Sequence, residues 1–150
     1  MATFKKSIVI QAPPEVLRRY LIDPTNLPHV FPNLSLISDV QNTAMNATHF
    51  TWEWQVLGVH FVGSAEMTEV IRNQELHMRF WGGLQGSMGI KLMPSAEGIM
   101  VETEFEYAIP APLLHKHSEK EVIEQNESNL DGFLHNLKAL IETRMHLQLH

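Results

Sequence analysis

The last fifty residues hold the feature that most constrains the fold, a strictly alternating strand followed by one very long amphipathic helix. From Ile99 to Ile109, apolar and aromatic side chains alternate with glutamates, which predicts a strand with one buried side and one wet side. Apolar residues at helical spacing then predict a helix over roughly Glu119–Met145. This helix would span ~40 Å and the strand ~36 Å. One element can therefore cover the other end to end, and we expect a hollow between a curved sheet and this helix.

Composition limits the classes of partner. A length of 150 residues fits a single domain covering 1–150. The net charge of -6, without a lysine or arginine cluster, argues against binding to nucleic acid. The absence of cysteine excludes disulfides and thiolate metal sites, and no stretch approaches the ~20 apolar residues of a membrane span. We expect a cytoplasmic chain without integral membrane association, and its oligomeric state stays open.

The rest of the chain predicts one strand, two short helices and a run of further strands. The first strand covers 3–11, and Asp23-Pro24 separates a helix that opens at Pro13-Pro14 from a helical turn over 25–31. The later strands are predicted at 34–40, 49–57, 59–71, around 76–80, at 84–93 and at 99–109. The alternation slips near Glu69, as a β-bulge would produce, and Gly132 is placed on the solvent side of the last helix. Short connections between strands indicate antiparallel pairing.

Several segments carry a resemblance to a known superfamily. The opening SIVIQAPPEVLRRYLIDPTNLPHVFPNL, the strand VETEFEYAIP and the closing NESNLDGFLHNLKALIE resemble START-like, or SRPBCC, proteins. The resemblance covers essentially the whole chain and implies an α+β helix-grip fold. In that fold a seven-stranded antiparallel sheet wraps around the C-terminal helix, two short helices follow strand 1, and a deep hydrophobic cavity lies between. No catalytic motif of the superfamily maps onto this sequence, so we assign no catalytic residue and expect no cofactor.

Aromatic and methionine side chains gather on the predicted inward faces. Phe50, Trp52 and Trp54 share one strand face and would form a wall against which rings or acyl chains stack. Plain core packing is the alternative for any single residue of the set. The predicted apolar ligand contacts are Val30, Phe31, Phe50, Trp52, Trp54, Phe61, Met78, Phe80, Met88, Phe105, Leu130 and Phe133.

Polar groups on inward faces are fewer. Thr103 and Tyr107 lie on the buried side of the last strand, and Asn126 lies about 40° from Leu130 on the helical wheel, inside the apolar stripe. A buried amide must find partners or lose ~1–3 kcal/mol. These three residues complete the predicted ligand site, with purely structural hydrogen bonding as the alternative.

The nine histidines do not form a recognisable metal motif. His115 and His117 form an H-x-H near a helix start, where residues two apart do not share a face. By alternation, His49, His60 and His77 point outward from their strands. We therefore predict no metal site.

Three functions remain open. The first is binding or transport of a small hydrophobic molecule, such as a lipid, quinone, polyketide or aromatic compound, in an internal cavity. The second is a polyketide cyclase or dehydratase, which would need a titratable group inside the cavity, such as one that a register slip turns inward (His77, Arg79 or Glu69). The third is a protein-interaction module of the chaperone-activator type, which a large exposed apolar patch would favour.

Overall fold

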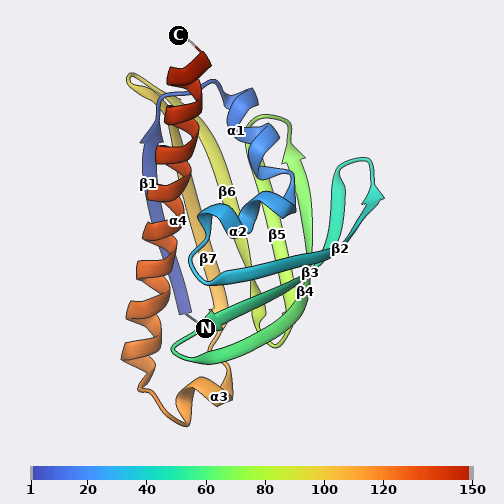
Figure 1. The fold of residues 1–150 in the computed structure, drawn as a ribbon, viewed down its shortest axis with the longest axis vertical. Helices are drawn as coiled ribbons and strands as arrows, with labels where there is room; N and C mark the ends of the chain where they lie inside the picture. Colours follow the sequence, from blue (N-terminus) through green and yellow to red (C-terminus); the bar gives the residue numbers. More distant parts are fainter. Residues whose placement is uncertain (1, 149–150) are drawn as a thin grey trace.

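The computed structural model describes residues 2–148 and shows one antiparallel sheet that curves around a long helix (Figure 1). The strands are β1 (Ala2–Ile10), β2 (Leu34–Ala44), β3 (Ala47–Val56), β4 (Val59–Ile71), β5 (Glu75–Gly82), β6 (Gln85–Ser95) and β7 (Gly98–Ala108). Their order across the sheet is β1-β7-β6-β5-β4-β3-β2. Six strands thus follow one another as a meander, and β1 pairs antiparallel with the last of them. The predicted α+β helix-grip fold is confirmed.

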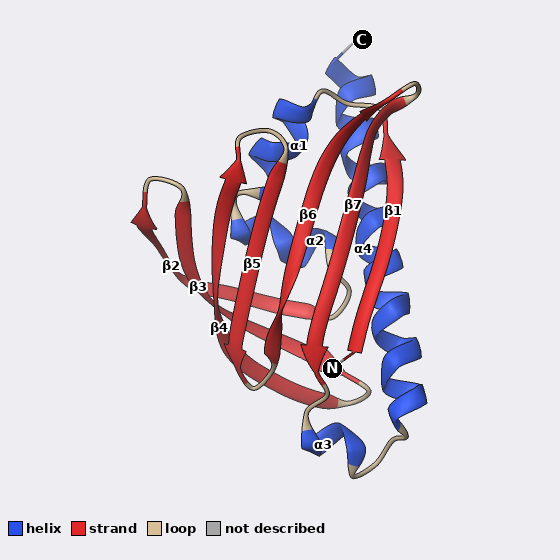
Figure 2. Ribbon diagram, turned by 180° about the vertical axis from the view of Figure 1, so that it is seen from behind, coloured by secondary structure: helices blue, strands red, loops and turns tan. Residues whose placement is uncertain are grey.

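The principal helices lie on one face of this sheet (Figure 2). They are α1 (Pro14–Leu21), the 3₁₀ turn η1 (Pro24–Asn26), α2 (Leu27–Val30) and α4 (Glu119–Gln148). A further short helix, α3 (Ala111–Leu114), lies beyond the lower end of the strands (Figures 1 and 2). The long helix α4 runs beside β1, while α1 and α2 lie beside the middle strands (Figures 1 and 2). The short helix α3 connects β7 to α4 and was not predicted, because four residues are too few for a periodic pattern. No helix among residues 2–148 combines the length and apolar character needed to span a bilayer.

The sheet's inner face carries the core, as the alternation predicted. The buried residues of β3 to β7 fall at every second position, although a few inward positions such as Val59 and Gly63 are only half-buried, and the intervening residues are mostly half-buried or exposed. The buried residues of these strands are Phe50, Trp52, Trp54, Val56, Phe61, Ala65, Met67, Leu76, Met78, Phe80, Met88, Ile90, Leu92, Ile99, Val101, Thr103, Phe105 and Tyr107.

Polar contacts fix α4 at its start and again in its second half. The Ser118 hydroxyl accepts a hydrogen bond from the Glu121 backbone N–H at 3.1 Å, and the Glu121 carboxylate accepts one from the Ser118 N–H at 3.2 Å. This reciprocal capping box sets the helix start. In the second half of the helix, Lys138 donates to the Val9 carbonyl at 2.7 Å, which ties α4 to β1. The helix is therefore held across the sheet independently of its apolar contacts.

Gly132 differs from its predicted place. It does not face open solvent, because a Cβ at this position would lie 2.8 Å from Cγ of Pro32. The small residue allows the segment between α2 and β2 to approach α4 closely. Two hydrogen bonds support this approach: Asn136 donates to the Val30 carbonyl at 2.9 Å, and the Trp54 indole donates to the Pro32 carbonyl at 3.0 Å.

Candidate functional site

A hollow lies between α2, β2 and the inner face of the sheet. The twelve residues that line it are Leu27, Phe31, Leu34, Ile37, Phe50, Trp52, Trp54, Met78, Phe80, Leu84, Met88 and Phe105. All twelve are apolar and none can titrate, so the hollow favours uncharged apolar molecules. The space open to the centres of water molecules is about 70 Å³, and the whole hollow, counted out to open solvent, is about 510 Å³.

These volumes bound the size of an occupant. One water needs roughly 10–15 Å³ on the smaller measure, so this space has room for a handful of waters. Pockets for drug-sized ligands are larger, commonly ~300–1,000 Å³. A ligand with more than one or two rings must therefore displace side chains at the mouth. The predicted cavity is present, but in this conformation its volume is smaller than that of a typical pocket for a drug-sized ligand.

Two indoles make one wall. Trp52 donates its ring N–H to the Ser64 carbonyl at 2.9 Å, and Trp54 donates to the Pro32 carbonyl. Because backbone oxygens satisfy both N–H groups, the apolar parts of both rings are free to face the hollow. Trp54 also meets Phe31 edge-on, with ring centroids 5.8 Å apart.

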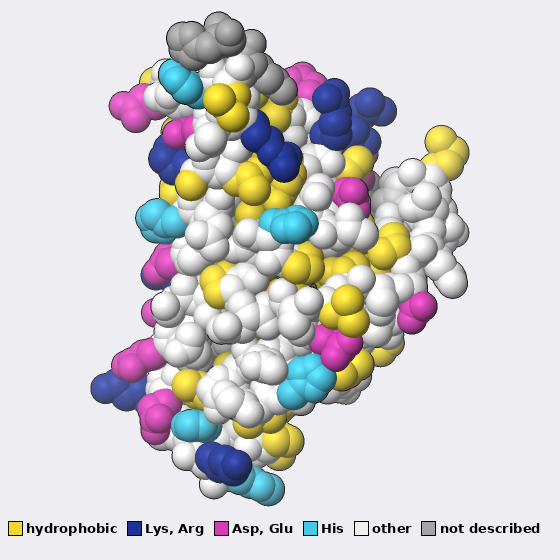
Figure 3. All heavy atoms as spheres, viewed as in Figure 1, with side chains coloured by type: hydrophobic (Ala, Val, Ile, Leu, Met, Phe, Trp, Pro, Cys, Tyr) yellow, Lys and Arg dark blue, Asp and Glu magenta, His cyan; other side chains and the backbone are white. Residues whose placement is uncertain are grey.

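The mouth lies beside α2 and β2. Nine of the lining residues are buried, whereas Phe31, Leu34 and Ile37 are partly exposed. Hydrophobic side chains gather on this face beside α2 and β2 in the space-filling view (Figure 3). The Phe31 ring contacts both Trp54 and Phe133, the latter at a centroid distance of 5.3 Å. Phe31 therefore sits between the opening and the core.

The structure divides the predicted apolar contacts into two groups. Eight line the hollow: Phe31, Phe50, Trp52, Trp54, Met78, Phe80, Met88 and Phe105. The other four, Val30, Phe61, Leu130 and Phe133, are buried in the core outside the lining. Leu27, Leu34, Ile37 and Leu84 were not predicted, because they come from a helical turn, the edge strand and a hairpin loop. The role of all these residues in ligand binding stays a prediction.

The three predicted polar residues are buried but lie outside the lining. Thr103 donates to the Lys6 carbonyl at 3.0 Å, a contact between paired strands that satisfies the hydroxyl structurally. Asn126 donates to the Tyr107 hydroxyl at 2.7 Å. Asn129, which was not predicted, is equally buried one turn further along α4. Its signal in the sequence is its position four residues before Phe133, on the same helix face.

A second cleft lies at the far end of the inner face. Its apolar surface comes from Ile22, Met67 and Leu76, and its polar surface includes Arg18 and Glu69. The bulge predicted near Glu69 is present as a register shift between β4 and β5. Arg18 forms a two-pronged ion pair with Glu69. These hydrogen bonds hold the pKa of the Glu69 carboxyl below its usual value, against the opposing effect of burial.

Of the other residues considered for an inward turn, His77 and Arg79 remain exposed on the outer side of β5. The Arg79 guanidinium lies over the Trp81 ring there, 5.0 Å from its centroid.

Among the histidines, His117 lies near the start of α4, with a ring nitrogen 3.3 Å from the Leu57 carbonyl oxygen and the other 3.4 Å from the Glu121 carboxylate. No group of three or more histidine and acidic side chains suited to a metal ion occurs in the described part of the chain.

Comparison with protein families gives one match over almost the whole sequence. The family described as "Polyketide cyclase / dehydrase and lipid transport" matches residues 1–142. No curated protein is similar enough in sequence to match the chain.

Solved structures show the same fold at low sequence identity. The Zhui aromatase/cyclase from Streptomyces sp. R1128 has a TM-score of 0.73 at 12% identity, covering 96% of this chain and 95% of its own. A START superfamily protein from Mycobacterium smegmatis has a TM-score of 0.70 at 11% identity, covering 94% and 97%. The di-domain ARO/CYC StfQ from the steffimycin biosynthetic pathway has a TM-score of 0.75 at 15% identity, with 96% of this chain covered. This chain spans about half of StfQ, 52% of its length. Identities this low show a common START-like fold and nothing finer.

Proposed function

Because the chain belongs to the polyketide cyclase/dehydrase and lipid transport family, we propose that it binds a small hydrophobic ligand in the hollow between α2, β2 and the sheet. The observation that carries the proposal is the lining of twelve apolar side chains around one opening. Burying apolar surface contributes about 25 cal/mol per Å² of binding free energy, and aromatic rings can stack on the indole wall. A compact, largely planar molecule such as a fused aromatic, a quinone or a polyketide-derived ring fits this lining best.

Binding is favoured over acid–base catalysis by the same lining. A cyclase or dehydratase that moves protons needs a titratable group within hydrogen-bond reach of its substrate. None of the twelve lining residues can supply or accept a proton at neutral pH. The inward carboxylate, Glu69, belongs to the second cleft and is engaged by Arg18. We therefore propose a binder or carrier, within a single ligand-binding domain, rather than an enzyme.

A thermal-shift screen against naphthalene, quinones, flavonoids and fatty acids tests this function. A compound present at one hundred times its dissociation constant stabilises the folded state by ~2.7 kcal/mol. For a chain of this size that corresponds to a rise in Tm of about 5–10 °C. If no apolar compound in the panel raises Tm, the proposal is contradicted.

A matched pair of variants locates the binding. Leu84→Phe adds volume inside the lining, whereas Val62→Phe adds the same kind of side chain on the exposed outer face of β4. The first substitution should abolish or reduce the shift, and the second should leave it unchanged. Equal shifts in both variants would place the ligand elsewhere.

A further inference from the structure

Behind the hollow lies a small buried polar cluster, formed by Tyr107, Asn126 and Asn129. Tyr107 is fully buried, and each asparagine is 3% exposed. Tyr107 follows Phe105 by two residues on the same face of β7, and their ring centroids are 5.2 Å apart. Phe105 itself lines the hollow. The Tyr107 ring of the cluster thus contacts a ring that lines the proposed ligand site.

The cluster has spare hydrogen-bonding atoms. Nδ2 of Asn126 donates to the Tyr107 hydroxyl, and Oδ1 of Asn129 accepts from Gln125 at 3.1 Å. The remaining amide atoms, Oδ1 of Asn126 and Nδ2 of Asn129, are buried and have no partner among the described residues. Turning the Asn126 amide over would not remove the deficit, because Tyr107 engages one amide atom in either orientation.

These spare atoms are complementary. Asn126 presents an acceptor and Asn129 a donor, from positions three apart that share a face of α4. A buried polar atom without a partner costs folding free energy, so most native structures satisfy such atoms. Thr103, on the same strand face as Tyr107, shows the usual solution, since its hydroxyl is bonded to the Lys6 backbone. The two asparagines lack such a solution.

We propose that Asn126 and Asn129 anchor a hydroxyl group at the inner end of an otherwise apolar ligand. The hydroxyl donates to Oδ1 of Asn126 and accepts from Nδ2 of Asn129, so that both spare atoms are used. The ring system to which it is attached occupies the apolar hollow, with the Phe105 ring displaced or passed at its edge. This inference rests on the proposed function, because it assigns the polar end of the same ligand.

The charges around the cluster favour a neutral group. Burial raises the pKa of the Tyr107 hydroxyl, and the negative charge of Glu119 raises it further, against the lowering effect of the Asn126 hydrogen bond. The same surroundings oppose a carboxylate or phosphate on the ligand. A ketone could use the Asn129 donor but would leave the Asn126 acceptor without a partner. An alcohol or phenol satisfies both.

Three probes of one shape test the anchor: naphthalene, 2-naphthol and 2-methoxynaphthalene. Their dissociation constants are measured by titration of the intrinsic tryptophan fluorescence at neutral pH. The wild-type protein should bind 2-naphthol about tenfold more tightly than naphthalene, as expected for one net buried hydrogen bond or two weaker ones. The methoxy compound accepts but cannot donate, and it should bind no more tightly than naphthalene.

Two variants separate the anchor from general packing. Asn126→Leu should remove the preference for 2-naphthol and leave naphthalene binding within about threefold. Asn136→Leu is the matched control on the same helix, where the amide already bonds the Val30 carbonyl. It should keep the tenfold preference, even where the loss of the bond to Val30 changes the affinities for both compounds by the same factor. Without ligand, the Tm of Asn126→Leu should differ little from that of the wild type, because the removal of the unpaired Oδ1 offsets the loss of the hydrogen bond to the Tyr107 hydroxyl. A cooperative thermal transition also shows that the variant folds.

The possible failures are distinguishable. If naphthalene binds and 2-naphthol binds no more tightly, the proposed anchor is wrong but the apolar binding site is still supported. This is the result expected if the cluster only holds a buried water. A preference that survives Asn126→Leu would also overturn it. Failure of all three probes to bind would overturn the proposed function and the anchor with it.

Discussion

The indole of Trp52 occupies the space in which a side chain at Gly63 would lie. The two residues are direct partners in the β3–β4 pair, and a Cβ at position 63 would sit 2.8 Å from Cε2 of the indole. Glycine therefore lets the ring lie against β4, where its N–H reaches the Ser64 carbonyl. Because the Trp52 indole lies against the sheet, it leaves the hollow in front of it open. The contact between Trp52 and Gly63 therefore maintains one wall of the hollow.

Gly63→Ala should destabilise the protein by about 1–3 kcal/mol, because the added methyl group would overlap both the Trp52 indole and the backbone carbonyl oxygen of Trp81 and would force the indole out of its place. The displaced ring should also reduce the affinity for naphthalene. Chemical denaturation followed by tryptophan fluorescence measures the first effect, and ligand titration measures the second.

Gly89→Ala is the matched control. Gly89 lies on β6, and a Cβ there would meet nothing within 4 Å. This substitution should leave stability unchanged or slightly raise it, since alanine reduces the conformational freedom of the unfolded chain. If both variants lose stability equally, the contact between Trp52 and Gly63 is not the cause.

Trp52→Ala should weaken the binding of naphthalene by at least about tenfold, through the loss of stacking and of apolar contact area. Trp81→Ala removes the same side chain from the outer face of β5, where Arg79 lies over it, and should change affinity less than about twofold. Isothermal titration of both variants makes the comparison. Unchanged affinity in Trp52→Ala would remove this residue from the binding wall.

Glu69→Gln should lower the free energy of unfolding by about 1–2 kcal/mol at neutral pH, because it breaks a partly buried, charge-assisted pair with Arg18. The folded-state pKa of Glu69 is lowered by its Arg18 hydrogen bonds. The stabilisation is therefore present above the usual glutamate pKa of about 4.3. It is lost as the pH falls through the lower folded-state value. Urea denaturation curves measured from neutral to acidic pH should converge for the two proteins at low pH, and a difference that persists there would contradict this account.

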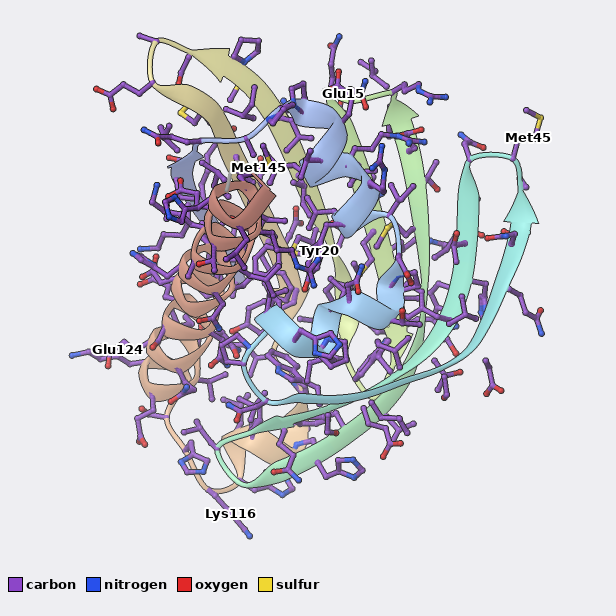
Figure 4. All side chains as sticks on the ribbon, turned by 45° about the horizontal axis from the view of Figure 1, so that its top comes forward. Glu15, Tyr20, Met45, Lys116, Glu124 and Met145 are labelled. Carbon is purple, nitrogen blue, oxygen red and sulfur yellow. The ribbon has the colours of Figure 1, made fainter. Side chains whose placement is uncertain are left out.

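Phe31→Ala should speed both entry and exit of naphthalene, because Phe31 lies between the opening and the Trp54 and Phe133 rings. Stopped-flow fluorescence should show both rate constants raised several-fold, with a smaller change in the dissociation constant. Met45→Ala serves as the control, since Met45 stands at the tip of the β2–β3 hairpin, away from the mouth (Figure 4). If Met45→Ala changes the rate constants and Phe31→Ala does not, the ligand enters through the second cleft, which Met45 helps to line.

Much of the fold could be predicted from periodicity. The alternation along β7 identified its buried face, and the break in alternation near Glu69 identified the bulge between Glu69 and Ile71. Glu69 itself still follows the inward alternation of Ala65 and Met67. The helical wheel placed Asn126 in the apolar stripe of α4, where it is buried. The start of α4 predicted near Glu119 from the apolar spacing agrees with the structure.

The site itself was only partly predictable. The size of the hollow depends on how the Phe31 ring and the two indoles pack. The sequence pattern shows which side chains face inward but does not show how much space they leave between them. The partner of Thr103 is the carbonyl of Lys6, 97 residues earlier in the chain, so alternation marked the threonine as buried but could not show that it was satisfied. Gly132 was misplaced because its neighbour, Pro32, belongs to a segment whose path over α4 is set by tertiary packing.

The most direct test is a measurement of NOEs between 2-naphthol and methionine methyl groups in the labelled protein. Met78 and Met88 line the hollow, whereas Met45 and Met67 line the second cleft, so the four methyl groups report on the two places separately. We expect intermolecular NOEs to Met78 and Met88 that disappear in Leu84→Phe. NOEs only to Met45 and Met67, or none at any methionine, would contradict an apolar ligand site in the hollow.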